Sequence, residues 1–223
     1  MTAAPAGRFS GPTAAFVAPF LIYAGMILVP VSPAVLFPVR CLVVLAVLVF
    51  VSRPYVSLKP SHTLASAGVG VLVFVIWIAP DLLFGYRHHW LFENALTGRA
   101  ASSLPPALRG NILFLAIRVL SSMALVPVLE ELFWRGWLMR WWINREFVNV
   151  RLGTYQAGAF WLVAVLFASE HGPYWEVGLA AGIIYNLWIM RTRNLADCIL
   201  AHAVTNGSLA AYVLVRGQWQ FWL

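Results

Sequence analysis

Long runs of apolar residues, separated by short polar stretches, recur along the whole chain of 223 residues. A helix that crosses a bilayer needs about 20 mostly apolar residues. The sequence is 61% hydrophobic and only 10% charged, whereas a soluble domain is about one quarter charged. One water-soluble core cannot bury so much apolar surface. We therefore predict an all-α polytopic transmembrane bundle, a single integral membrane domain over residues 1–223 with the lipid bilayer as its solvent.

The apolar runs predict about seven helices, covering approximately residues 14–31, 34–51, 64–84, 111–144, 154–171, 174–190 and 195–215. The polar segment 85–110 is expected to be an interfacial helix or a surface loop. Segment 111–144 is longer than one span, and Pro127 is expected to kink it because proline removes a backbone donor. The first run lacks a convincing cleavage site and is interpreted as a retained membrane helix.

The formal net charge of +7 is carried by residues scattered between the apolar runs. Since no basic block or RNA-binding motif accompanies it, we do not expect nucleic-acid binding. Lys and Arg instead mark the cytoplasmic ends of membrane helices. With the N-terminus inside, the inner segments carry the larger set, Arg8, Arg53, Lys59, Arg140, Arg145, Arg151, Arg191 and Arg193. The bias predicts a cytoplasmic N-terminus.

The stretch LEELFWR places two glutamates and an arginine inside an apolar run. Ionisable residues in a membrane span cost at least about 2.5 kcal/mol each, so they are candidate functional residues. Glu131 and Arg135 are four residues apart and are expected to pair on one helix face. Glu130 has no basic residue at the same spacing and is expected to remain unpaired. A structural ion pair and an acid at a helix end are the alternatives for these residues.

Two histidines and an asparagine lie on later predicted helices. FASEH places Phe167 and His171 four residues apart, and HAVTN places His202 and Asn206 on one helix face. Alone, each pair is also typical of a polar contact between helices. Together with the glutamates, they come from three helices and are expected to line one intramembrane polar cavity.

These residue types suit hydrolysis of an amide bond, which requires an activated water, an oxyanion donor and a proton for the leaving amine. Glu130 and His171 are candidates to bind and deprotonate the water. His202 and Asn206 are candidates to donate to the oxyanion. No serine or cysteine lies in a nucleophile motif, so a water mechanism is favoured over a covalent one.

The motifs EELFWR, FASEH and HAVTN, in this order on successive helices, resemble the CPBP family (CAAX protease and bacteriocin processing). Its members are glutamate-dependent intramembrane proteases, relatives of type II CAAX prenyl endopeptidases. The resemblance covers roughly residues 125–210, within a predicted catalytic core of approximately 111–215. It implies that Glu130 and His171 activate the water. It also implies that Glu131 supports the site and is held by Arg135, while His202 and Asn206 form the oxyanion site.

The resemblance further implies that Phe167 lines the substrate cavity, and Trp134 is expected to do the same. The substrate would be a membrane-associated peptide or protein, either prenylated or carrying a sorting signal. A short chain of this kind also resembles the CAAX-protease-related proteins found with exosortase-type sorting systems. We therefore expect it in a bacterial cytoplasmic membrane.

Two other functions remain open. A zinc protease would use His171, His202 and a glutamate, but the sequence contains no HExxH pair. Cys41 and Cys198 lie in apolar stretches and show no metal-binding spacing. We therefore expect no cofactor, with zinc the less favoured alternative. A non-enzymatic scaffold, an immunity protein or a polar-core transporter could also use buried charges.

Overall fold

The computed structural model describes residues 11–222, and this part of the chain folds into seven helices and no strand. The first three are α1 (Pro12–Gly25), α2 (Pro33–Val47), which continues through a π-helical turn to Tyr55, and α3 (Thr63–Phe84). The fourth is a single rod built from α4 (Ile112–Leu120), α5 (Val126–Glu131) and α6 (Met139–Ile143). The last three are α7 (Ala157–Ser169), α8 (Trp175–Thr192) and α9 (Leu195–Arg216).

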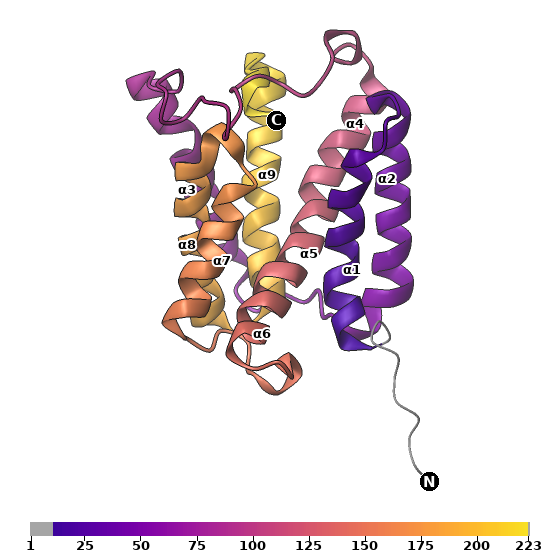
Figure 1. The fold of residues 1–223 in the computed structure, drawn as a ribbon, viewed down its shortest axis with the longest axis vertical. Coiled ribbons are helices and arrows are strands. Elements are labelled where there is room, and N and C mark those ends of the chain that lie inside the picture. The colour runs from indigo at the N-terminus through magenta and orange to yellow at the C-terminus, as the bar shows by residue number, and fades with distance from the viewer. Residues whose placement is uncertain (1–10, 223) are drawn as a thin grey trace.

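The rod α4–α6 joins two groups of helices (Figure 1). At one end of the bundle α4 lies beside α2, and at the other end α6 lies beside α7. α1 and α2 form one side of the molecule, and α3, α7, α8 and α9 form the other. The centre of the rod, α5, packs against α9. The segment that carries the first polar motif therefore lies between the two groups.

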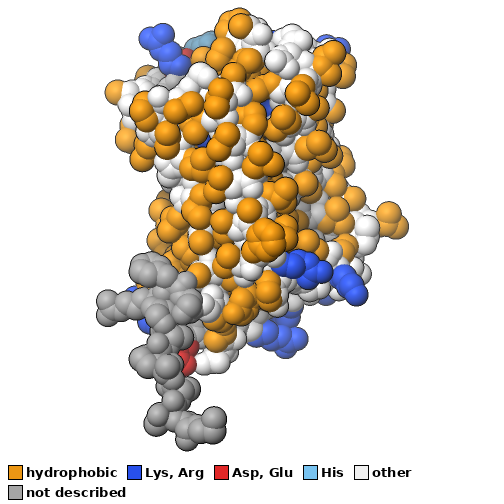
Figure 2. Space-filling view, turned by 90° about the vertical axis from the view of Figure 1, so that its right-hand side faces the viewer, with side chains coloured by type: hydrophobic (Ala, Val, Ile, Leu, Met, Phe, Trp, Pro, Cys, Tyr) orange, Lys and Arg blue, Asp and Glu red, His pale blue; other side chains and the backbone are white. Residues whose placement is uncertain are grey.

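Four helices of the described part are long and apolar enough to cross a membrane: Pro33–Tyr55, Thr63–Phe84, Ile112–Ile143 and Leu195–Arg216. Two apolar helices, Pro12–Leu28 and Ala157–Ser169, are shorter. Large apolar side chains such as Phe50, which is 81% exposed, point outward. Figure 2 shows hydrophobic side chains over most of one face, with Lys and Arg toward its two ends. The protein is thus an integral membrane protein whose surface suits lipid.

The predicted all-α bundle is confirmed, and each predicted helix is present. α1 ends earlier than predicted, at Gly25 with a 3-10 turn to Leu28. α7 ends at Ser169, and the chain then forms a short 3-10 turn at Gly172–Tyr174. Proline at position 173 cannot continue the α-helical hydrogen bonding. The segment 85–111 is a loop with short turns, so the surface-loop alternative holds and the interfacial helix does not form.

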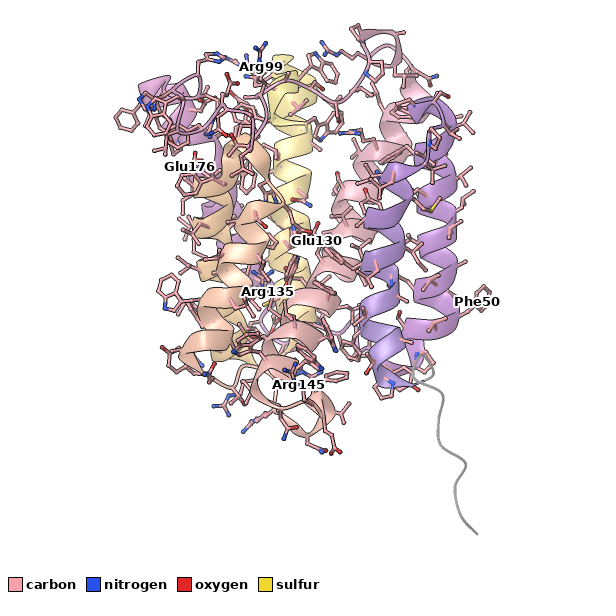
Figure 3. The ribbon with its side chains drawn as sticks, in the orientation of Figure 1. Phe50, Arg99, Glu130, Arg135, Arg145 and Glu176 are labelled. Atoms are coloured by element: carbon pink, nitrogen blue, oxygen red, sulfur yellow. The ribbon has the colours of Figure 1, made fainter. Side chains whose placement is uncertain are left out.

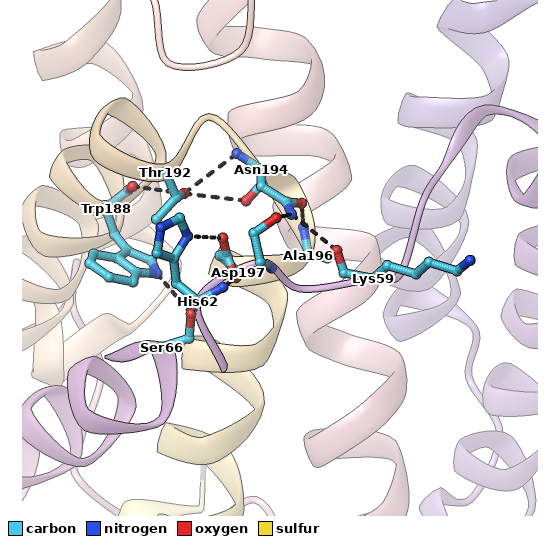
Figure 4. A network of polar contacts seen from close by, with 9 residues as sticks. Lys59, His62, Ser66, Trp188, Thr192, Asn194, Ala196 and Asp197 are labelled. Atoms are coloured by element: carbon cyan, nitrogen blue, oxygen red, sulfur yellow. Dashed lines mark hydrogen bonds and ion pairs between the residues drawn. The ribbon is translucent and has the colours of Figure 1, made fainter. Parts of the chain in front are cut away.

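The loop before α3 is tied to the start of α9 by a buried carboxylate (Figure 4). Asp197, fully buried, accepts hydrogen bonds from the backbone N–H groups of Ser61 (2.9 Å) and His62 (2.8 Å). The His62 ring lies 3.1 Å from the same carboxylate, and Ser66 donates to it at 3.4 Å. These contacts fix the register of α3 against α9. Their close packing is possible because Gly70 faces the backbone of Ala201.

Basic residues gather at the end of the bundle where α1 begins. In the described residues this end carries Arg53, Lys59, Arg140, Arg145, Arg151, Arg191 and Arg193. The opposite end carries Arg87, Arg99, Arg109 and Arg216. Arg8, which was counted with the first set, lies outside the described residues. Figure 3 places Arg145 and Arg99 at opposite ends of the molecule.

Candidate active site

The rod α4–α6 is not a regular α-helix around the two glutamates. π-helical turns at Ser121–Leu125 and Leu132–Leu138 flank α5, which carries Glu130 and Glu131. A π-helical turn widens the helix and is frequent at functional sites. The first of these turns ends two residues before Pro127. The kink expected at Pro127 stays a prediction, and neither widened turn was predicted.

The expected pairing of Glu131 with Arg135 is confirmed. Both side chains are fully buried, and Arg135 Nη1 lies 3.0 Å from Glu131 Oε1. Arg135 Nε donates to Asn186 Oδ1 at 2.9 Å, and Nη2 donates to the Gly182 carbonyl at 3.2 Å. The guanidinium also lies 4.7 Å from the centre of the Phe167 ring. Three hydrogen bonds from three nitrogen atoms hold the arginine to α5 and α8, and the Phe167 ring adds a contact from α7.

Asn186 is part of this network and was not among the predicted site residues. It is fully buried on α8, and its Nδ2 donates to the Phe160 carbonyl at 2.9 Å. The signal for it was a single amide side chain in the apolar run GLAAGIIYNLW, where an unpaired polar group would be costly.

His202 lies between the two glutamates. Its Nδ1 is 3.0 Å from Glu131 Oε1, and its Nε2 is 3.9 Å from Glu130 Oε2. A carboxylate accepts from Nδ1–H, so the bond to Glu131 fixes the ring and directs Nε2 to Glu130. The ring also stacks on Tyr185, with centres 5.2 Å apart. His202 is therefore held in one orientation by α5 and α8.

Glu130 differs from Glu131 in having no strong partner. Its Oε2 is buried and makes no hydrogen bond with any described residue. The 3.9 Å to His202 Nε2 is too long for a direct hydrogen bond, and a water beside the two atoms would bridge them. Figure 3 shows Glu130 near the middle of the bundle, above Arg135. A carboxylate at this depth with an unused oxygen suits proton transfer.

His171 follows the end of α7. Its Nδ1 lies 2.7 Å from the Phe167 carbonyl, which only accepts, so Nδ1 carries the proton and Nε2 is the free acceptor. Its ring packs on Phe167 and Trp77, with centres 4.8 and 5.0 Å away. Trp77 lies seven residues before the end of α3, about 10 Å along the helix. Because α7 is short, His171 lies inside the bundle rather than at its surface.

Both histidines pack against Phe167, whose ring centre is 4.8 Å from that of His171 and 6.0 Å from that of His202. Within residues 11–222, no hydrogen bond or ion pair joins His171 to Glu130. The structure thus brings His202, rather than His171, next to Glu130. Trp134 packs edge-on against Phe167 at 6.3 Å, so the two predicted wall residues touch.

Asn206 lies one helical turn beyond His202, but its amide is already engaged. Its Nδ2 donates to the Ser122 carbonyl at 2.9 Å. In a π-helical turn each carbonyl accepts from the N–H five residues later, as Ser121 does from Val126. For Ser122 that residue is Pro127, which has no N–H. The Asn206 amide therefore replaces the backbone N–H donor that Pro127 lacks. One amide hydrogen of Asn206 remains for another acceptor.

The loop after α3 closes over the turn that carries His171. Arg87, only 3% exposed, forms ion pairs with Asp81 at 3.4 Å and Glu176 at 2.8 Å. It also donates to the Pro173 carbonyl. These bonds join the end of α3 and the start of α8 to the residues directly after His171.

The described part of the chain has, among its hollows, an apolar groove of about 510 Å³ between α2 and α4–α5 and a polar pocket of about 370 Å³ beside Arg87. Glu130 lines neither of them. The polar cavity expected around Glu130 stays a prediction. Within residues 11–222, no three His, Cys, Asp or Glu side chains are grouped as a metal site.

Comparison with known families agrees with the motifs. Residues 112–208 match the family described as type II CAAX prenyl endopeptidase Rce1-like. The matched segment contains EELFWR, FASEH and HAVTN, so the resemblance drawn from these motifs is confirmed. No curated protein and no solved structure matches the chain.

Proposed function

We propose that this protein is a member of the CAAX protease family, which the match over residues 112–208 supports. We further propose that it is a glutamate-dependent intramembrane endopeptidase. Its substrate is a membrane-associated peptide or protein, prenylated or carrying a sorting signal. The observation that carries the proposal is the buried, unbonded Oε2 of Glu130, 3.9 Å from His202 Nε2. An enzyme that uses water needs such an unoccupied base near a second polar group.

In the proposed reaction, Glu130 accepts a proton from a water molecule while the water oxygen bonds to the substrate carbonyl carbon. His171 assists through its free Nε2, since its Nδ1–H is bound to the Phe167 carbonyl. The carbon–nitrogen bond then breaks, and the proton held by Glu130 passes to the leaving amine. One water is consumed, and the products are a carboxylic acid and an amine.

His202 and Asn206 are proposed to donate to the oxyanion. The bond from His202 Nδ1 to Glu131 directs Nε2 into the site. With both ring nitrogens protonated, Nε2–H becomes a donor to the developing negative charge. Asn206 retains one amide hydrogen beyond the one bound to Ser122. Glu131 and Arg135 are proposed to position His202 rather than to touch substrate.

The test is cleavage by Glu130→Gln, which keeps the size of the side chain and removes the base. We expect the rate to fall by about 10²–10⁴-fold without loss of thermal stability. Comparing peptides from cells that carry the wild type or Glu130→Gln should reveal a precursor that accumulates uncut. Glu146→Gln is a matched control, because Glu146 is an exposed glutamate in the loop after α6, away from the site. Cleavage by Glu130→Gln at the wild-type rate would contradict the proposal.

The proposed mechanism uses no metal. Metal analysis of the purified protein separates it from the zinc alternative. We expect full activity in the presence of a strong chelator and no stoichiometric zinc. Activity lost on chelation and restored by zinc would favour the metalloprotease. Retention of biological function by Glu130→Gln, His171→Ala and His202→Ala together would favour a non-enzymatic role.

We also propose a location in a bacterial cytoplasmic membrane, with the N-terminus in the cytoplasm. The support is the set of basic residues at the end of the bundle where α1 begins, since Lys and Arg favour the cytoplasmic side.

A further inference from the structure

A long apolar groove lies between α2 and the first half of the rod α4–α6. Its volume is about 510 Å³. The walls are almost entirely carbon, from Leu42, Leu45, Leu48 and Val49 on one side and Leu120, Ala124, Leu125, Val128 and Leu132 on the other. Several of these side chains are exposed, including Leu42 (66%) and Leu120 (65%). The groove is therefore open on the lipid-facing side of the molecule.

The groove is separate from the candidate active site. Val128 lines it and Glu130 does not. Consecutive residues of a helix are rotated by about 100°, so Glu130 points about 200° away from Val128. The two features lie on opposite faces of α5.

One end of the groove carries a cation without a protein partner. Arg53 lines it and is exposed, and within residues 11–222 its guanidinium forms no hydrogen bond or ion pair. Arg53 follows the π-helical turn of α2, at the basic end of the bundle. Leu42 lines the groove eleven residues earlier, which corresponds to about 16 Å along the helix. The groove thus has an elongated apolar body and one positively charged end.

We propose that this groove binds an anionic phospholipid, with one acyl chain along the apolar walls and the phosphate at Arg53. An acyl chain is the long, flexible hydrocarbon that a bilayer supplies to such a surface. A zwitterionic lipid would offer Arg53 no net charge, whereas an anionic headgroup attracts a basic residue at the membrane surface. The shape and the single unpaired cation together select this class of lipid.

Ser121 provides an independent test of whether an acyl chain occupies the groove. It lines the upper part of the groove, is 5% exposed, and its hydroxyl makes no hydrogen bond with a described residue. Hydrocarbon leaves this hydroxyl unpaired, so Ser121→Ala, which turns the hydroxymethyl side chain into a methyl group, favours an acyl chain.

The experiment measures lipid binding to the purified, delipidated full-length protein by native mass spectrometry. The probes are phosphatidylglycerol and phosphatidylcholine with identical chains. We expect the wild type to bind phosphatidylglycerol about five-fold more tightly, as one added basic contact allows. Arg53→Gln should remove this preference. Arg191→Gln, which removes an exposed arginine at the same end of the bundle, should keep it.

A second pair of variants tests the apolar walls. Ala124→Trp fills the groove and should abolish binding of both lipids at this site, whereas Ala211→Trp, at an exposed position of α9, should not. Ser121→Ala should retain or strengthen binding.

The proposal is overturned by equal affinity of the wild type for the two lipids, or by equal effects of Arg53→Gln and Arg191→Gln. It is also overturned if Ala124→Trp leaves lipid binding intact or if Ser121→Ala abolishes binding. A third contrary outcome is that the purified protein is a dimer without bound lipid and Ala124→Trp dissociates it, since a second copy of the chain would then cover the groove.

Discussion

At the scale of single residues, Arg135 is the most constrained side chain of the candidate site. Its guanidinium is fully buried and bonded to Glu131, Asn186 and the Gly182 carbonyl. A buried charge is tolerated only when paired and hydrogen-bonded. Arg135 therefore stabilises the bundle as well as holding Glu131 in place.

We expect Arg135→Ala to lower the free energy of unfolding by about 3–5 kcal/mol, because it leaves Glu131 buried without its cation. Thermal and denaturant unfolding of the detergent-solubilised protein measures this effect. Arg145→Ala is the control, since Arg145 is exposed and stacks on Trp141, and its loss should cost less than about 1 kcal/mol. Equal costs for the two variants would show that the buried network contributes no special stability.

The pairing of Glu131 with Arg135 was predictable because helical spacing alone brings the two side chains together. The contacts of His202 were not, because they depend on how α9 is rotated against α5 and α8. The same limit applies to Asn186, whose partners come from α7 and from the rod. Spacing within one helix carries no information about the rotation of its neighbours.

At the scale of helices, the apolar runs located each element to within a few residues. The predicted segment 64–84 corresponds to α3 at Thr63–Phe84, and 195–215 corresponds to α9 at Leu195–Arg216. The π-helical turns of the rod were not predicted, because a widened turn leaves the apolar pattern almost unchanged. The sequence feature that marks the first π-helical turn is Pro127, which lies in the middle of a long apolar run.

The contact between α3 and α9 gives a prediction about one glycine. A methyl group at Gly70 would overlap the Ala201 carbonyl oxygen and come within 2.7 Å of Val204 Cβ. We expect Gly70→Ala to destabilise the protein by about 1–3 kcal/mol. Gly68→Ala, two residues away with nothing within 4 Å, should be neutral or stabilising by up to about 1 kcal/mol. The free energies of unfolding of both variants, measured in the same detergent, test this prediction. A Gly70→Ala variant as stable as the wild type would contradict the observed packing.

The bond from Asn206 to the Ser122 carbonyl predicts coupling with Pro127. In the wild type, Asn206→Ala leaves the half-buried Ser122 carbonyl without this partner and should cost about 1–3 kcal/mol. In a Pro127→Ala background the new N–H at residue 127 satisfies Ser122, so the cost of Asn206→Ala should be smaller. A double-mutant cycle on unfolding free energies measures this difference.

Cleavage assays on the same four proteins separate structure from catalysis. If Asn206 donates to the oxyanion, Asn206→Ala should reduce the cleavage rate in both backgrounds. Full activity of the double variant would assign Asn206 to the helix alone. Equal stability costs in both backgrounds would contradict the role of Pro127.

At the scale of the whole molecule, the two ends of the bundle differ in charge, and this asymmetry predicts orientation. Arg145 and Arg99 lie at opposite ends (Figure 3). In a background without Cys41 and Cys198, Arg99→Cys should react with a membrane-impermeant maleimide in intact spheroplasts. Arg145→Cys should react only after the membrane is opened. The reverse pattern would place the N-terminus outside.

The bond between Asn206 and Ser122 also predicts how positions 127 and 206 should vary together in evolution. While residue 127 is a proline, loss of the asparagine exposes a bare carbonyl, so selection acts on the two positions jointly. A descendant that replaces the proline is released from that joint constraint. If such lineages keep an asparagine at position 206, its role is in the reaction. If they replace it freely, its role was to bond the Ser122 carbonyl of the helix.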